Sequence, residues 1–247
     1  MRIAMTEQNL PGPPPKLDGI GKVALFLDFD GTLVPIADEP GAIDVPRDLS
    51  ARLESLSART GHRLAIVSGR SLDDLAEFLG TPALFRAGSH GSDVIAPDGD
   101  SLRSAEAIPD DVKRSLQTYA EANGLYFEDK PHGAGLHSRK APDRFDAMVA
   151  FGQEIASEAG LACKVGKHVI ELVQPGTGKD GAVRLLMQQA AFAGAVPVFV
   201  GDDVTDEDGF TACNEAGGFG VAVGERVSAN ARYRLGSVKE VYEWLKL

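Results

Sequence analysis

The sequence predicts an α/β fold in which a doubly wound core is interrupted by an inserted α+β module. Short apolar runs, such as residues 22–29 and 196–200, alternate with helical segments, and such runs are typical of strands buried on both faces of a parallel sheet. This alternation breaks off after Gly91 and resumes near Lys179. The stretch between them has the pattern of hairpins and helices, which indicates a separate module inserted into the core.

The segments before the insertion carry local signals for their boundaries. Pro46 suits the first turn of a helix and Gly61 suits its end, while Ser71 and Asp74 have the spacing of a capping box. In chain order, we predict a strand over 22–29, a helix over 46–60, a strand over 63–67, a helix over 71–79 and a strand over 83–87.

The segments after the insertion resume the same alternation. The last of them has apolar residues at helical spacing and is predicted to be an amphipathic helix. In chain order, we predict a helix over 179–193, a strand over 196–200, a helix over 206–215, a strand over 219–223 and the final helix over 237–247.

The middle of the chain is predicted to be antiparallel. In chain order, we expect a hairpin around Asp98–Gly99, a helix over 109–122, a strand near Tyr126, a hairpin turning at Gly133–Gly135 with its tip over 132–136, a helix over 142–159 and a strand over 168–173. We therefore assign residues 20–103 and 177–247 to the core and residues 104–176 to the inserted module. The proline-rich residues 1–19 are predicted to be a disordered tail.

Composition excludes several classes of function. The chain has 25 basic and 36 acidic residues and a net charge of −11, so it is a poor ligand for nucleic acids, whose binding depends on basic side chains. No apolar run reaches the roughly 20 residues of a membrane helix, and the start lacks the apolar stretch of a signal peptide. Cys163 and Cys213 are too far apart to indicate a disulfide framework. We expect a monomer in the cytoplasm that binds a small molecule.

Candidate functional residues gather where the predicted strands end. The carboxyl ends of parallel strands meet at one edge of a sheet, where ligand sites form. The residues at these positions are Asp28 and Asp30 at the end of the first strand, Ser68 and Gly69 after the second, Lys179 at the start of a helix, and Asp202, Asp203 and Asp206 after a later strand. Four elements thus bring carboxylates, one hydroxyl and one ammonium to one edge.

Crowded carboxylates indicate a cation. Mg²⁺ fits best, because it prefers hard oxygen ligands and is often held by one or two carboxylates together with phosphate and water. A cluster of histidines and cysteines, as zinc would require, is absent from the sequence. We therefore predict Mg²⁺ as the cofactor.

Asp28 and Asp30 have the spacing for covalent phosphoryl transfer. One carboxylate can attack phosphorus while the other moves a proton. A carboxylate about 4 Å from a phosphate charge is opposed by roughly 4 kcal/mol at an effective dielectric constant of ~20, so a metal ion and Lys179 are needed to offset the repulsion. Ser68 and the amides of Gly69 and Asp30 can donate hydrogen bonds to phosphoryl oxygens.

These motifs resemble those of the haloacid-dehalogenase-like phosphatases. The motifs are LDFDGTL over 27–33, SGR over 68–70, Lys179, and GDDVTDEDGF over 201–210. More narrowly, GSHG over 88–91 and GDDVTDED over 201–208 are similar to phrases of the trehalose-6-phosphate phosphatase family, and the resemblance covers residues 20–247. It implies a Rossmann-like core with an inserted cap domain that acts as a substrate lid.

The resemblance also implies roles for the core residues. Asp28 would be the nucleophile and a metal ligand, and Asp30 would protonate the leaving sugar oxygen and later activate water, with its carbonyl on Mg²⁺. Asp202 would close the metal site, supported by Asp203 and Asp206. Further residues implied are Ser68, Gly69 and Lys179 for the phosphoryl group, with Thr32 orienting Asp30 and with Arg70 and His90 in support.

For the cap, the family pattern is matched by a Glu-x-Lys, a His-x-Arg and a later Glu. Charged side chains make strong, directional hydrogen bonds to hydroxyls, as binding of a disaccharide requires. The residues concerned are Glu128, Lys130, His137, Arg139 and Glu171. The resemblance therefore implies Mg²⁺-dependent hydrolysis of trehalose 6-phosphate in trehalose biosynthesis.

Two other functions share parts of this pattern. A different sugar-phosphate phosphatase or a phosphohexomutase would use the same core with a similar lid. A signalling receiver domain also accepts phosphate on an aspartate beside Mg²⁺, but it needs about half this length and no inserted module.

Overall fold

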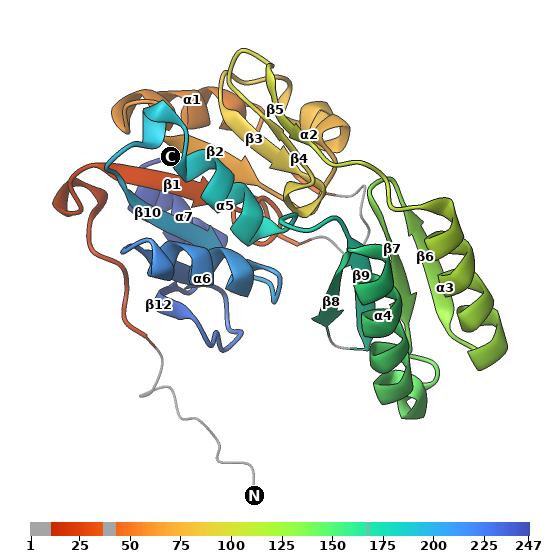
Figure 1. The fold of residues 1–247 in the computed structure, drawn as a ribbon. Coiled ribbons are helices and arrows are strands. Elements are labelled where there is room, and N and C mark those ends of the chain that lie inside the picture. The colour runs from red at the N-terminus through yellow and green to blue at the C-terminus, as the bar shows by residue number, and fades with distance from the viewer. Residues whose placement is uncertain (1–10, 37–42, 167) are drawn as a thin grey trace, which may run out of the picture. The chain divides into compact units, whose positions relative to one another are not determined.

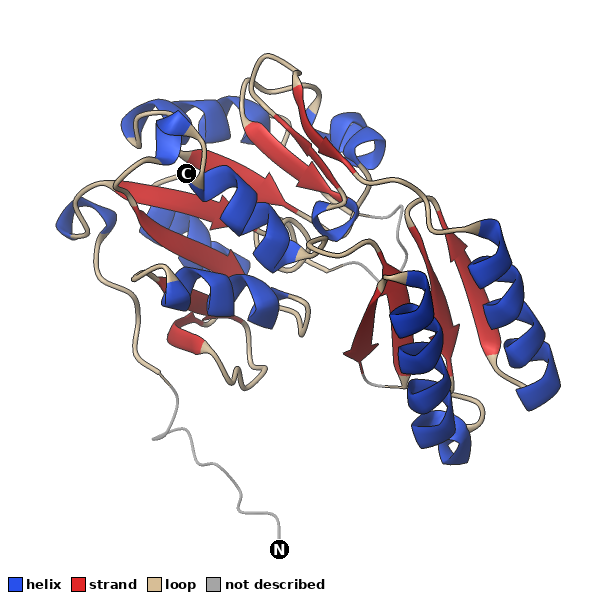
Figure 2. Cartoon of the chain, in the orientation of Figure 1, coloured by secondary structure: helices blue, strands red, loops and turns tan. Residues whose placement is uncertain are grey.

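The computed structural model describes residues 11–36, 43–166 and 168–247, and it confirms the predicted fold class. The described chain divides into two compact units, one of Ser104–Thr177 and one formed by the residues before and after it. Figures 1 and 2 show the elements of each unit. Within the described ranges, no helix is long and apolar enough to cross a membrane.

The first unit is built on an eight-stranded sheet in the order β12-β11-β10-β1-β2-β3-β4-β5. The pairs from β12 to β3 are parallel, and β4 is antiparallel to β3. Its strands are β1 (Val23–Leu27), β2 (Leu64–Val67), β3 (Phe85–Gly88), β4 (Asp93–Ile95), β5 (Ser101–Ser104), β10 (Val196–Gly201), β11 (Phe219–Val223) and β12 (Ala231–Leu235).

Helices cover both faces of this sheet, as Figure 1 shows. The helices are α1 (Leu49–Arg59), α2 (Leu72–Leu79), α5 (Lys179–Met187), α6 (Asp206–Glu215) and α7 (Val238–Leu245). Leu25 and Leu27 of β1 pack with α1, α2 and α7, whereas Ala24 and Phe26 pack with α5 and α6. Each of these β1 side chains is fully buried, which explains why the strand is apolar at every position.

The second unit is a four-stranded antiparallel sheet in the order β6-β7-β9-β8, with two helices. Its elements are α3 (Asp110–Asn123), β6 (Tyr126–Lys130), β7 (Gly133–His137), α4 (Phe145–Ala159), β8 (Ala162–Gly166) and β9 (Val169–Val173). One sheet face packs its apolar side chains against α3 and α4. Strand register places Glu128, Gly135, Glu171 and Lys164 in one row across the sheet.

Several boundaries differ from the prediction. The strands β8 and β12, each at the edge of its sheet, were not predicted. The helix predicted over 179–193 ends at Met187, and a separate 3-10 turn (Ala190–Phe192) follows. This break places the Phe192 ring 5.7 Å from that of Phe26, inside the apolar core.

The second predicted hairpin turns at a different place. Gly133 and Gly135 lie inside β7, and the turn is formed by the two residues before Gly133. A Cβ on Gly133 would lie 2.7 Å from the carbonyl oxygen of Leu172 in β9. Glycine is therefore required there by close strand packing, which has the same sequence signature as a turn.

Residues 11–19, predicted to belong to a disordered tail, contact the first unit. Pro14 is buried, a 3-10 turn spans Leu17–Gly19, and the Trp244 indole donates a hydrogen bond to the Pro15 carbonyl. Residues 1–10 of that predicted tail lie outside the described residues.

Candidate active site

The site of the first unit is built on a buried lysine held between two buried aspartates. Lys179 begins α5, and its Nζ donates hydrogen bonds to Asp28 Oδ1 at 2.8 Å and to Asp206 Oδ1 at 2.6 Å. Asp28 follows β1 and Asp206 begins α6, so the lysine links three elements. The three side chains are 3%, 6% and 0% exposed, respectively, so these ion pairs are shielded from water.

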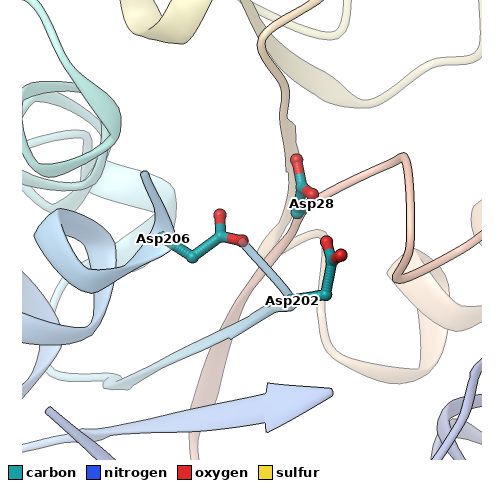
Figure 3. Close-up of side chains that lie close together, drawn as sticks. All are labelled: Asp28, Asp202 and Asp206. Carbon is teal, nitrogen blue, oxygen red and sulfur yellow. The ribbon is translucent and has the colours of Figure 1, made fainter. Parts of the chain in front are cut away.

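Asp202 completes a cluster of three carboxylates. It lies in the turn between β10 and α6, and one oxygen from each of Asp28, Asp202 and Asp206 lies within 4.8 Å of the other two. Figure 3 shows these side chains converging from three places in the chain. Two carboxylates about 5 Å apart repel by roughly 3 kcal/mol at an effective dielectric constant of ~20, so the arrangement favours a bound cation.

Burial and mutual repulsion alter the protonation of this cluster. Burial raises the pKa of Asp28 to about 8, against the opposing charge of Lys179, and Asp206 and Asp202 add to the rise. Burial, together with the charges of Asp206 and Asp203, raises the pKa of Asp202 to about 6. Burial alone would lower the pKa of Lys179, but Asp28 and Asp206 outweigh it and raise that pKa, so the lysine stays charged.

Two glycines allow the carboxylates to approach the backbone. A Cβ on Gly31 would lie 2.2 Å from Asp202 Cγ, and a Cβ on Gly201 would lie 2.2 Å from Asp206 Cγ. Gly31 also has a φ of 74°, in the left-handed region that favours glycine. These glycines were not singled out from the sequence: the partner of Gly31 is distant in the chain, and the partner of Gly201 lies beyond the turn that follows it.

Asp30 pairs with Arg70 and is not one of the three clustered carboxylates. The guanidinium donates from Nε to Asp30 Oδ2 at 2.6 Å and from Nη2 to Asp30 Oδ1 at 2.8 Å. The same guanidinium carbon lies 4.9 Å from the centre of the Phe78 ring. Arg70, predicted only to give support, thus fixes the position of Asp30 through a bidentate ion pair.

The loops after β2 and β3 are joined through their backbones. His90 donates its amide to the Ser68 carbonyl at 2.9 Å, and Ser89 donates its amide to the Arg70 carbonyl at 2.7 Å. Ser89 and His90 both have positive φ, which bends the loop sharply. Ser68 is buried, and its Oγ accepts the Arg70 amide at 3.1 Å. Gly69 lines the same pocket as Asp28 and Lys179.

Two other predicted residues have different surroundings from those expected. Thr32 is fully buried, and its hydroxyl has no hydrogen-bond partner within the described ranges. It therefore makes no hydrogen bond to Asp30, which it was expected to orient. Asp203 is exposed and lies outside the carboxylate cluster, but its backbone amide donates to Asp206 Oδ2 at 2.8 Å.

The predicted cap residues form a charged group of their own in the second unit. His137 Nε2 lies 2.8 Å from Glu128 Oε2, and Lys130 Nζ lies 3.1 Å from Glu171 Oε1 and 3.8 Å from Glu128 Oε2. Arg139 is exposed and lines a hollow together with Glu128 and His137. Lys164 shares their sheet face opposite Glu171, but it was missed from the sequence because β8 was missed.

The sheet order and the acidic site at its strand ends define the class of protein. The chain superposes with a TM-score of 0.66 on a phosphatase of the haloalkanoate (HAD) enzyme superfamily from Bacteroides thetaiotaomicron, at 17% identity, covering 96% of this chain and 97% of that one. The fold is therefore that of the HAD-like phosphatases.

Comparison with known proteins identifies the family within this class. A family model described as trehalose-phosphatase matches residues 26–238. The chain is 36% identical to the trehalose-6-phosphate phosphatase of Escherichia coli over 92% of this chain and 86% of that protein. It is 38% identical to a protein named probable trehalose-phosphate phosphatase from Sinorhizobium fredii, over 87% of this chain and 82% of that one. The chain belongs to the trehalose-phosphatase family, a family of hydrolases.

A solved structure of the family has the same fold. A crystal form of Aspergillus fumigatus trehalose-6-phosphate phosphatase superposes with a TM-score of 0.71 at 25% identity. The match covers 91% of this chain and 92% of that one.

The close approach of Asp202 to Gly31 predicts the effect of a single methyl group. Gly31→Ala should displace Asp202 and reduce phosphatase activity by about a hundredfold, as an ångström-scale misplacement can do. Gly80→Ala is the matched control, because Gly80 has a similar φ of 66° with nothing within 4 Å of its Cβ position. The control should lose only about 1–3 kcal/mol of stability, because a φ of 66° with a ψ of −149° is disfavoured for alanine. Equal activity of the two variants would contradict the proposed constraint on Asp202.

Proposed function

We propose that the chain is a Mg²⁺-dependent phosphatase that hydrolyses trehalose 6-phosphate to trehalose and phosphate through an aspartyl-phosphate. The observation that carries the proposal is the buried Asp28 carboxylate, hydrogen-bonded by Lys179 beside Asp202 and Asp206. Membership of the trehalose-phosphatase family supports the choice of substrate.

In this proposal Asp28 is the nucleophile. Its carboxylate oxygen attacks phosphorus, the bond from phosphorus to the sugar oxygen breaks, and Asp30 gives its proton to the leaving oxygen. Asp30 then takes a proton from a water molecule as that water attacks phosphorus of the aspartyl-phosphate, which releases phosphate and restores Asp28. To act as the acid, Asp30 must carry a proton, so its ion pair with Arg70 must loosen when substrate binds.

The other residues of the site bind and orient the phosphoryl group. Lys179 places a positive charge beside Asp28, and Gly69 lines the same pocket, where its amide can donate to a phosphoryl oxygen. We assign a further donor role to the hydroxyl of Ser68, which is buried directly before Gly69. Asp28, Asp202 and Asp206 would hold Mg²⁺, because their oxygens are close together and hard oxygen ligands suit this ion. When bound, Mg²⁺ neutralises charge that develops on the transferring group.

In this proposal the second unit, residues 104–177, is the cap, and the remaining described residues form the catalytic core. We assign sugar recognition to the charged face of the cap. Glu128, Lys130, His137 and Glu171 form a connected polar group on that face. Such a group offers both donors and acceptors to a disaccharide rich in hydroxyls.

We also propose a cytoplasmic monomer that works on a small dissolved substrate. The net charge of −11 and the free thiols of Cys163 and Cys213 support this setting.

A substrate panel with Mg²⁺ tests the activity. Trehalose 6-phosphate should have a higher kcat/KM than glucose 6-phosphate or sucrose 6-phosphate, and Asp28→Asn should abolish turnover because an amide cannot form the acyl phosphate. The control Asp18→Asn changes an aspartate that is 79% exposed and should leave turnover unchanged.

Three results would contradict this proposal. A higher kcat/KM for glucose 6-phosphate or sucrose 6-phosphate would refute the substrate. Return of phosphate to a sugar hydroxyl would indicate a mutase. Stable phosphorylation without turnover would indicate a receiver-like module.

The raised carboxylate pKa values predict that protons compete with Mg²⁺. Asp202, with a pKa of about 6, is mostly protonated at pH 5 and mostly ionised at pH 7.5. Lowering the pH over this range should therefore weaken Mg²⁺ binding by about tenfold or more, with proton release on binding. Calorimetry on the substrate-free protein in buffers of different ionisation enthalpy measures both effects. The same Mg²⁺ affinity at both pH values would show that no carboxylate that titrates between them is a metal ligand.

The assignment of the cap predicts a selective loss. Lys130→Ala and Glu171→Ala should each lower kcat/KM for trehalose 6-phosphate about tenfold more than for an aryl phosphate, because the small substrate lacks the sugar contacts. Arg144→Ala is the control, since Arg144 lies in the same unit but pairs with its neighbour Asp143, at 3.7 Å, and not with this group. Equal losses on both substrates would mean that these residues do not recognise the sugar.

A further inference from the structure

Arg226 binds the backbone of the turn between β10 and α6, here called the acidic turn, which carries Asp202 and leads into Asp206. It lies in the loop after β11, and its Nε donates to the Asp202 carbonyl at 2.8 Å while Nη2 donates to the Asp203 carbonyl at 2.9 Å. These two carbonyls belong to the turn between β10 and α6. A single guanidinium therefore fixes two successive peptide groups.

The guanidinium is itself fixed on its third side. Its Nη1 donates to Glu207 Oε1 at 2.7 Å, and Glu207 Oε2 accepts the Asn230 amide at 2.9 Å. Glu207 belongs to α6 and is 16% exposed on its side chain, so the pair is partly shielded from water. Arg226 thus connects the acidic turn, the first turn of α6 and the loop that leads to β12.

The acidic turn needs this support because its side chains repel those around them. Lys179 binds Asp28 and Asp206 directly, whereas Arg226 holds Asp202 through its backbone. Without an anchor on the outer side, repulsion within the cluster would open the turn and move Asp202 away. A planar guanidinium suits this task, since it offers several donors in fixed directions and a lysine does not.

We propose that Arg226 is a positioning residue for the metal site, which it acts on through the backbone of Asp202 and Asp203. It holds the turn so that Asp202 and Asp206 already face Asp28 before a cation binds. The proposal rests on the metal site proposed above and adds a residue that the site motifs do not contain.

Metal affinity of the substrate-free protein tests this role directly. Arg226→Ala should weaken Mg²⁺ binding, measured by calorimetry, by about tenfold or more, because it removes charge-assisted hydrogen bonds to the turn. Arg184→Ala is the matched control, since Arg184 pairs with Glu215 at the far end of the same helix α6. The control should bind Mg²⁺ within about twofold of the original chain.

Three further measurements separate positioning from a general loss of structure. Arg226→Lys keeps the charge and should give an intermediate affinity, and the exchange of the Asp203 and Asp206 amides with deuterium should be fastest in Arg226→Ala. Saturating Mg²⁺ should restore most of kcat in both variants, because the residue acts before the chemical step.

The outcomes distinguish this inference from the proposed function. Unchanged Mg²⁺ affinity in a folded Arg226→Ala, or in Arg226→Lys if the alanine variant does not fold, would overturn the role of Arg226 alone. A loss of kcat that saturating Mg²⁺ does not restore would also overturn it. If the original chain bound no Mg²⁺, the proposed metal site would fail and this inference with it.

Discussion

The architecture of the site depends on the buried ammonium of Lys179 between Asp28 and Asp206. Removing one partner of such a buried ion pair typically costs about 3–5 kcal/mol, because it leaves an uncompensated charge inside the protein. With all groups ionised, the three clustered carboxylates and one ammonium leave two negative charges without a partner. The lysine stabilises the folded site, and the remaining charge attracts a divalent cation.

The fold creates this arrangement by ending several elements at one place. The strands β1 and β10 are adjacent and parallel, so Asp28 and Asp202 leave the sheet at the same edge. Glycines at positions 31 and 201 leave room for the carboxylates, and Arg226 supports the turn from outside. Backbone geometry thus adds to the ion pairs of Lys179 in holding together carboxylates that repel one another.

Much of the fold could be predicted because its core is regular. The predicted helix over 206–215 and the strand over 219–223 match the observed elements, since buried apolar runs and caps are local signals. The edge strand β12 was missed although Ala231, Tyr233 and Leu235 alternate with arginines, a pattern that could have revealed it. The other missed strand, β8, is no more than partly buried along its whole length, so its sequence gives a weak signal. Gly133 was placed in a turn because a glycine required by strand packing has the same local signature.

The candidate residues of the site could be named from strand ends and family motifs, but their contacts could not. The pairing of Arg70 with Asp30 joins residues 40 positions apart, and nothing local predicts it. The most direct test of the account is a crystal structure with Mg²⁺ and beryllium trifluoride, a mimic of an aspartyl-phosphate. We expect the beryllium on an oxygen of Asp28 and the metal among Asp28, Asp202 and Asp206. Beryllium on a different carboxylate, or a metal outside this cluster, would contradict the account.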